Sequence, residues 1–158
     1  MKTKQHREIY NKNLLHPWGD LSELGNDDSS SVIVKGDGIY IFDSDGNRMI
    51  DGPAGMWCMQ TGYGRREIAD AVSQQMLNLS YATSFTLINN KETELAKRIS
   101  ENTPGDLNRI YFTTGGSTAV DSALRLCQPA NNIKGKNTKK QILTREKAYH
   151  GSTYLSAS

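Results

Sequence analysis

Cysteine, proline and long apolar runs are all scarce in this sequence. Its 158 residues include two cysteines and four prolines. Cys58 and Cys127 cannot build a disulfide framework, so a reduced, intracellular and cytoplasmic protein is expected. The charged N-terminal residues have no apolar run behind them, which argues against a secretory signal. No stretch is long enough to cross a bilayer, so no membrane partner is expected.

Charge of one sign is not in excess either. The 19 Lys and Arg residues nearly balance the 17 Asp and Glu residues, for a net charge of +2. A nucleic-acid-binding surface needs a concentrated basic patch, which this sequence lacks, so no nucleic-acid partner is expected. The histidines at positions 6, 16 and 150 lack the spacing of metal ligands, so no metal site is expected.

Short apolar runs joined by Asp-Gly turns fill residues 32–50, and this pattern is typical of hairpins. It predicts a three-stranded antiparallel meander. The acidic residues around Asp43 have some likeness to a calcium loop, but the closing glutamate is missing, so a turn is favoured. The polar residues before position 32 predict irregular structure.

Apolar residues recur at helical spacing after Arg66, and further helices are predicted over 90–101 and from 119 onward. Asn89 or Asn90 is a plausible N-cap of the second helix. Residues 109–112 and 140–144 have the pattern of strands. This order predicts the start of an α/β domain with a parallel sheet. Two parallel strands cannot cover their own edges, so the chain is expected to be the first part of a larger protein.

Residues 51–64 combine many glycines with large apolar side chains and little charge. A loop of this composition is expected to pack against a ligand or a partner chain. A dinucleotide fingerprint is excluded there, because Glu67 occupies the place of its third glycine.

Two short segments carry the candidate chemistry. Residues 113–118 read Thr-Thr-Gly-Gly-Ser-Thr between a predicted strand and a predicted helix, where glycines and free N–H groups favour an anion. The hydroxyls of Ser117 and Thr118 could bind phosphate oxygens; the alternative is a glycine turn that one of them caps. No Walker lysine is present.

The second segment is Tyr149-His150-Gly151, at the predicted edge of the sheet where α/β proteins bind ligands. A ring there could stack on a flat cofactor, although a lone histidine is more often a packing or capping residue.

Together these segments resemble the class III pyridoxal-phosphate-dependent aminotransferases of fold type I, which include the omega-amino acid transaminases. The resemblance runs from about His16 to the last residue. It is carried by His16-Pro17-Trp18, the two Asp-Gly hairpins with Ile50-Asp51-Gly52, Gly55-Met56-Trp57, Gly62-Tyr63-Gly64, Phe112 to Ser117 with Ala119, and Tyr149-His150-Gly151.

The resemblance implies an α/β fold with two parts. Residues 1–52 would form an N-terminal segment with the antiparallel meander, which is part of the small domain. Residues 53–158 would begin the three-layer α/β/α domain that binds pyridoxal phosphate.

The resemblance also implies a set of site residues. The cofactor phosphate would lie at Gly116 and Ser117, and Tyr149 would stack on the pyridine ring with His150 and Gly151 beside it. The residues implied for the substrate pocket are Met56, Trp57, Trp18 near its mouth, and Phe85, which members offer to the neighbouring subunit. Thr118 departs from the acidic residue of many members, while Asp121 lies one helical turn further on.

By the same resemblance, the intact protein would be a homodimer that moves an amino group from an amine or omega-amino acid to a keto acid such as pyruvate. Members carry their Schiff-base lysine beyond the point that matches residue 158, so this chain alone is expected to be inactive and no catalytic residue is assigned in it. Two other hypotheses stay open: a non-catalytic association module, and a small phosphate-binding α/β domain.

Overall fold

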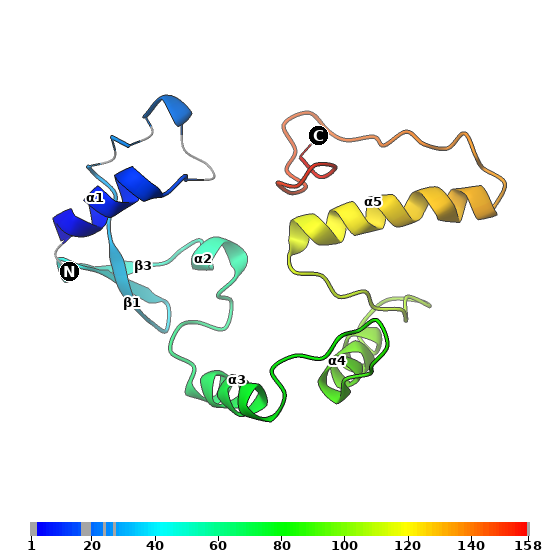
Figure 1. The fold of residues 1–158 in the computed structure, drawn as a ribbon, viewed down its shortest axis with the longest axis horizontal. Coiled ribbons are helices and arrows are strands. Elements are labelled where there is room, and N and C mark those ends of the chain that lie inside the picture. Colours follow the sequence, from blue (N-terminus) through cyan, green and yellow to red (C-terminus); the bar gives the residue numbers. More distant parts are fainter. Residues whose placement is uncertain (1–2, 17–19, 24, 27, 158) are drawn as a thin grey trace. The chain divides into compact units, whose positions relative to one another are not determined.

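The structure is a computed structural model that describes residues 3–16, 20–23, 25–26 and 28–157 (Figure 1). Contacts divide the chain into two compact units, residues 1–81 and residues 82–158. This division by contacts does not test the expected domain boundary after residue 52, which stays a prediction.

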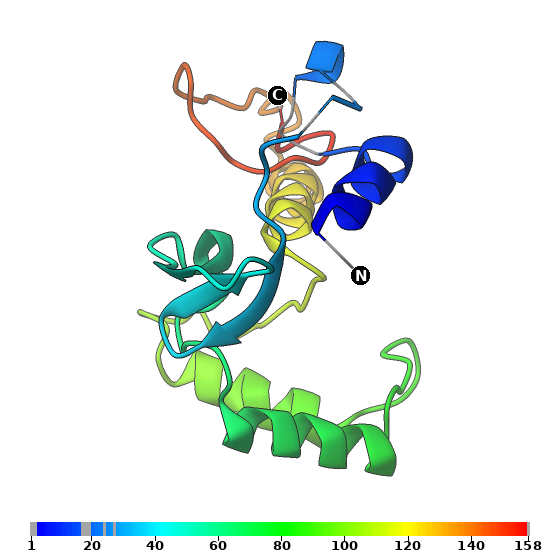
Figure 2. The same ribbon diagram turned by 90° about the vertical axis from the view of Figure 1, so that its left-hand side faces the viewer.

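An antiparallel sheet is the centre of the first unit. It consists of β1 (Ile33–Asp37), β2 (Tyr40–Asp43) and β3 (Arg48–Ile50), paired in chain order (Figure 2). The predicted meander is therefore confirmed. Its turns contain Gly38 and Gly46, whose φ angles of 55° and 88° are ones that residues with a Cβ rarely adopt.

The turn between β2 and β3 is organised by the buried carboxylate of Asp43. One oxygen accepts the backbone N–H groups of Asp45 and Asn47 at 3.0 and 2.8 Å, and the other accepts the Asn47 side-chain amide at 2.8 Å. The hydrogen bonds from Asn47, side chain first, hold the pKa of Asp43 below its ordinary value. This carboxylate serves the turn, as the sequence favoured.

A helix precedes the sheet, where the sequence predicted irregular structure. Helix α1 (Thr3–Asn13) is followed by the short 3-10 helix η1 (Leu21–Glu23). The prediction was wrong because α1 is polar almost throughout and carries no apolar stripe. Its ties to the rest of the unit are polar as well: Thr3 shares a 2.6 Å hydrogen bond with Ser44, and Arg7 donates to the Ser30 carbonyl at 3.0 Å.

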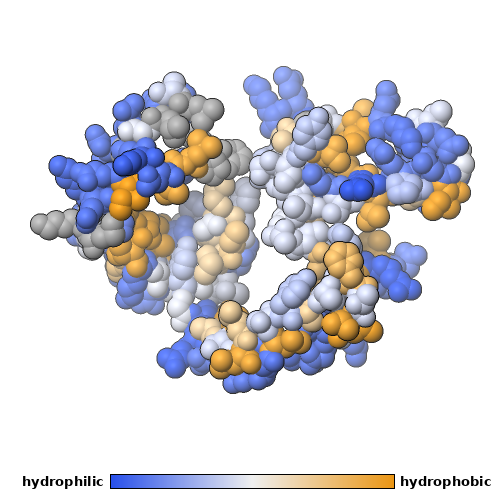
Figure 3. Space-filling model, viewed as in Figure 1, coloured by the Kyte–Doolittle hydropathy of each residue, from blue (hydrophilic) through white to orange (hydrophobic). Residues whose placement is uncertain are grey.

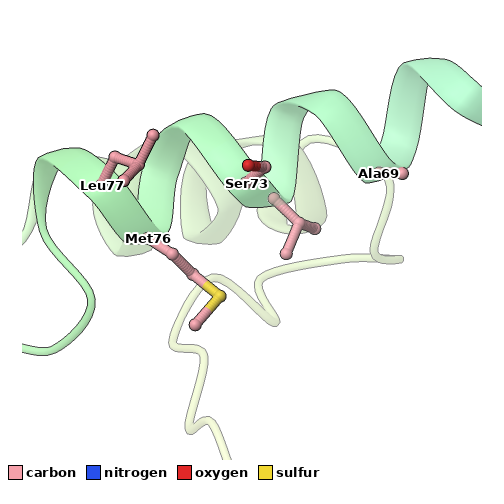
Figure 4. A pocket seen from close by; sticks show the side chains of 5 residues that line it. Ala69, Ser73, Met76 and Leu77 are labelled. Atoms are coloured by element: carbon pink, nitrogen blue, oxygen red, sulfur yellow. The ribbon is translucent and has the colours of Figure 1, made fainter.

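Two helical segments follow the sheet. The one-turn element α2 (Ala54–Trp57) is left-handed, with φ and ψ of 59° and 41° at Gly55. Helix α3 (Arg66–Asn78) lies where it was predicted. One face of α3 forms an apolar groove on the surface, drawn in Figure 4. The groove is lined by Ala69, Val72, Ser73, Met76 and Leu77.

The second unit contains α4 (Asn90–Ser100) and α5 (Gly116–Ile133). The Asn89 side chain accepts the N–H groups of Lys91 and Glu92 at 2.7 and 3.4 Å, which confirms Asn89 as the N-cap of α4. Helix α5 begins three residues before the predicted Ala119, directly at the Gly-Gly pair.

Neither of the two predicted parallel strands forms. Residues 109–112 and 140–144 have no regular secondary structure. A strand exists only through hydrogen bonds to a neighbouring strand. Neither segment has such a neighbour among the described residues, so these two predictions were wrong for this structure.

Burial is low throughout the described part of the chain. No apolar side chain there is buried, and large hydrophobic residues of both units lie exposed, as the orange patches in Figure 3 show. Among the same residues, no helix is both long and apolar enough to cross a membrane.

Candidate functional site

The start of α5 presents unpaired backbone donors. Gly115 is the N-cap and supplies no side chain to the helix. No described residue accepts a hydrogen bond from the N–H groups of Gly116, Ser117 or Thr118. The Ser117 and Thr118 side chains do not accept from these N–H groups. The Thr118 hydroxyl instead donates to the Gly115 carbonyl at 2.8 Å.

The segment after His150 returns to this same helix end, and Figure 1 shows it beside the start of α5. Gly151 is buried with a φ of 146°, and a Cβ added to it would lie 2.9 Å from the Ser117 Cα and would also collide with Ser156. Only glycine allows so close an approach. The structure thus brings together Ser117 and Gly151, which the sequence named separately.

Hydrogen bonds fasten the returning segment to α5. The Ser152 N–H donates to the Ser117 hydroxyl oxygen at 3.0 Å, and the Ser156 N–H donates to the Asp121 carboxylate at 2.8 Å. The Ser117 and Ser152 hydroxyls also lie 3.5 Å apart, and either can donate to the other, so the Ser117 proton can point to Ser152 or to a bound anion. Ser156 is itself 3% exposed, which makes it one of the few buried polar residues.

Tyr149 and His150 precede this contact. His150 shares a 2.8 Å hydrogen bond with the Thr144 hydroxyl through Nε2, which fixes its ring. Tyr149 is 56% exposed. All five residues expected to hold the cofactor therefore lie in the second unit.

The residues expected to line the substrate pocket are divided between the units. Met56 and Trp57 belong to α2 in the first unit and are 59% and 69% exposed. Phe85 belongs to the second unit and is 94% exposed. Trp18 lies outside the described residues. These assignments stay predictions.

The glycine-rich loop that carries Met56 and Trp57 has a polar centre. A single oxygen of the Asp51 carboxylate accepts the Tyr63 hydroxyl at 2.6 Å and the Gly55 N–H at 2.8 Å. The hydrogen bond to Asp51 raises the pKa of the Tyr63 phenol, and partial burial adds to this shift.

Sequence reasoning missed two participants, Ser152 and Ser156. Both contacts to α5 join residues 35 positions apart, which no local pattern reveals. The available signal was the run of small polar residues after Gly151, which is typical of a turn that hydrogen-bonds its neighbours through side chains.

Two solved transaminase structures match the fold of this chain. The chain matches one from the marine bacterium Virgibacillus with a TM-score of 0.91 and 33% identity, over 96% of this chain and 34% of that one. It matches an (S)-enantioselective omega-transaminase from Thermomicrobium roseum with a TM-score of 0.92 and 32% identity, over 99% and 35% of the two chains. The predicted fold class, the start of the transaminase α/β fold, is thereby confirmed.

The sequence comparisons give the family. The model of the family described as aminotransferase class III matches residues 23–158. The chain therefore belongs to the class III aminotransferases.

Two curated relatives illustrate the range of that family. Putrescine–pyruvate aminotransferase of Pseudomonas aeruginosa is 37% identical over 158 residues, which are 99% of this chain and 34% of that protein. Diaminobutyrate–2-oxoglutarate transaminase of Halomonas elongata is 38% identical over 128 residues, 80% of this chain and 27% of the relative. The chain thus spans about a quarter to a third of the length of these relatives.

Proposed function

We propose that the protein containing these residues is an aminotransferase that uses pyridoxal phosphate to move an amino group from an amine or omega-amino acid to a keto acid. The observation that carries the proposal is the junction of Gly151 with Ser117 at the open start of α5. Family membership supports the reaction type. The names of the relatives, with putrescine, diaminobutyrate, pyruvate and 2-oxoglutarate, indicate the substrate classes to test.

The residues at the junction fit a cofactor with a phosphate group. The unpaired N–H groups at Gly116 and Ser117 lie at the positive end of an 18-residue helix, where a dianion is stabilised. The Ser117 hydroxyl adds a donor, and no described acidic side chain makes a hydrogen bond to this turn. Bound pyridoxal phosphate would supply an electron sink for the carbanion formed at the amine carbon.

The proposal gives each of the site residues a defined role. Gly116 and Ser117 bind the phosphate, and Tyr149 offers its ring face to the pyridine, with His150 and Gly151 beside it. Met56 and Trp57, with Trp18 and the partner-directed Phe85, select the amino donor by shape. The proposal assigns the Schiff-base lysine to none of the described residues.

A homodimer is part of the proposal. Residues 51–64 and 81–88 expose many large apolar side chains and almost no charge, which a lone monomer avoids. A second copy that buries both segments would cover them and bring Phe85 to the neighbouring site. The compartment proposed is the cytoplasm, because two cysteines in 158 residues cannot build a disulfide framework.

The test uses the protein made from the complete reading frame that contains these residues. It is incubated with pyridoxal phosphate, pyruvate and either putrescine or 4-aminobutyrate, and alanine is measured. Amine-dependent alanine formation by a protein that light scattering shows to be dimeric is expected. Absence of both cofactor binding and alanine would refute the proposal. Phosphate binding without amino transfer would favour a simple phosphate-binding domain instead.

A further inference from the structure

The turn that carries Met56 and Trp57 has an unfavourable backbone. Ala54, Gly55, Met56 and Trp57 have φ angles of 50°, 59°, 58° and 67°. Three of these four residues carry a Cβ, which collides with the following carbonyl in a left-handed turn. Such conformations persist only where the surroundings impose them, and they concentrate at ligand sites. Something in the described structure must therefore hold this turn.

Asp51 makes contacts that can do so. Its backbone carbonyl accepts the Ala54 N–H at 3.1 Å, and its carboxylate oxygen Oδ2 accepts the Gly55 N–H at 2.8 Å. The first two N–H groups of the left-handed turn are thereby bound to one residue. The same Oδ2 accepts the Tyr63 hydroxyl at 2.6 Å.

Tyr63 connects this carboxylate to the sheet. It exchanges two backbone hydrogen bonds with Gly38, at 2.8 and 3.1 Å, in the turn between β1 and β2. Its ring lies so close to Gly36 of β1 that a Cβ there would be 2.5 Å from the ring. The tyrosine is therefore fixed at its backbone and ring, and its hydroxyl end reaches Asp51.

We propose that Asp51 and Tyr63 are positioning residues, which hold the left-handed turn against the meander and so set where Met56 and Trp57 meet the amino donor. The part of this inference that concerns the donor rests on the proposed function. The part that concerns the turn does not. Asp51 and Tyr63 belong to the first unit, and the residues proposed to hold the cofactor belong to the second. We therefore expect changes in the pair to affect donor recognition and not cofactor affinity.

The variants separate the loss of a hydrogen bond to Asp51 from the loss of its negative charge. Tyr63→Phe removes the hydroxyl alone, and Asp51→Ala removes the acceptor. Asp51→Asn keeps one oxygen, and because both hydrogen bonds end on a single oxygen, this variant can rescue the turn. Tyr40→Phe is the matched control, since the Tyr40 hydroxyl makes no hydrogen bond among the described residues.

The first measurement is hydrogen exchange of the Gly55 amide in the protein made from the complete reading frame. Asp51→Ala is expected to speed exchange by about tenfold or more, the factor that one hydrogen bond to a charged group corresponds to. Tyr63→Phe is expected to have a smaller effect in the same direction, and Asp51→Asn to stay near the parent. Exchange as slow in Asp51→Ala and Tyr63→Phe as in Tyr40→Phe would overturn the inference.

The second measurement compares KM for the amino donor with cofactor affinity. We expect KM to rise about tenfold in Tyr63→Phe with little change in kcat or cofactor affinity. A protein without any transamination would refute the proposed function, while the exchange data would still decide whether the pair holds the turn. If the parent is active and donor KM is unchanged, or if cofactor affinity falls in parallel with KM, the positioning role is refuted and the proposed function stands.

Discussion

Replacing Gly36 by alanine tests the contact between β1 and Tyr63. Gly36 pairs with Ile41 of β2, and the Tyr63 side chain covers its Cα. A Cβ at this position would lie 2.5 Å from Cγ, 2.6 Å from Cδ1 and 2.8 Å from Cβ of Tyr63. Rotation of the Tyr63 side chain moves Cγ and Cδ1 but not Cβ, and the backbone hydrogen bonds to Gly38 hold the backbone that carries this Cβ. Rotation alone therefore cannot relieve the whole clash.

The size of the effect follows from two opposing terms. Overpacking by one methyl group costs about 1–3 kcal/mol. A glycine-to-alanine change that fits its site stabilises by about 0.4–1 kcal/mol, because the unfolded chain loses freedom. The net expectation for Gly36→Ala is a loss of about 1–2 kcal/mol.

Gly52→Ala is the matched control. A Cβ at Gly52 would meet no atom within 4 Å, and Gly52 is not among the glycines with a positive φ. Gly52→Ala therefore reduces the freedom of the unfolded chain without a steric clash in the folded one, and a small gain in stability is expected. Urea unfolding of both variants, followed by circular dichroism, measures the difference. Equal stability of Gly36→Ala and Gly52→Ala would refute the steric argument, as would failure of Tyr63→Ala to reduce the cost of Gly36→Ala.

Three further outcomes are expected. Ser117→Ala should weaken pyridoxal-phosphate binding by about tenfold to a hundredfold, since one charge-assisted hydrogen bond is lost; unchanged affinity in equilibrium dialysis would remove Ser117 from the site. Asn89→Ala should destabilise α4 by about 1 kcal/mol through loss of its cap, whereas Asn90→Ala, which removes no cap, should not; hydrogen exchange within the helix measures both. The folded-state pKa of Asp43 is lowered, so its contribution to stability is present above the unfolded pKa of about 3.9 and is lost as pH falls through the folded value. Acid unfolding should accordingly be steeper in the parent than in Asp43→Asn, and identical pH profiles would contradict this assignment.

The parts of the fold that the sequence predicted correctly are those with local causes. The meander depends on Asp-Gly turns at Gly38 and Gly46, where a positive φ is required within two residues of each strand. The start of α4 depends on Asn89 and the two N–H groups that follow it. Each of these signals acts over fewer than about five residues, so an amino-acid pattern is sufficient to reveal it.

The predictions that failed concern elements whose state depends on other segments. Residues 109–112 and 140–144 have strand composition, but β-propensity reflects how well a segment fits a neighbouring strand, and none is paired here. Helix α1 was missed because it lacks the signal that sequence analysis uses. It forms without an apolar stripe, and an apolar stripe is the main sequence signal of a helix.

The candidate site was half predictable on the same grounds. The sequence singled out the Gly-Gly-Ser turn and the segment Tyr149-His150-Gly151, and their cofactor role, which the family resemblance implied, stays a prediction. The structure shows why glycine is needed at 151: the chain passes directly over Ser117. The sequence could not identify Ser156 as the partner of Asp121, because that contact depends on where the returning segment lands.

Low burial gives these observations a common physical basis. The hydrophobic effect is the largest favourable term in folding, yet no apolar side chain in the described part of the chain is buried. Backbone hydrogen bonds, turns and a few polar contacts are what define its elements, and hydrogen bonds each contribute only about 1 kcal/mol net. A binding site needs side chains held to within about 0.5 Å. The contacts of Asp51 and Tyr63 hold the backbone of the α2 turn, but the Met56 and Trp57 side chains stay exposed. In the proposed dimer, a second copy packed on Met56, Trp57 and Phe85 would fix the side chains themselves.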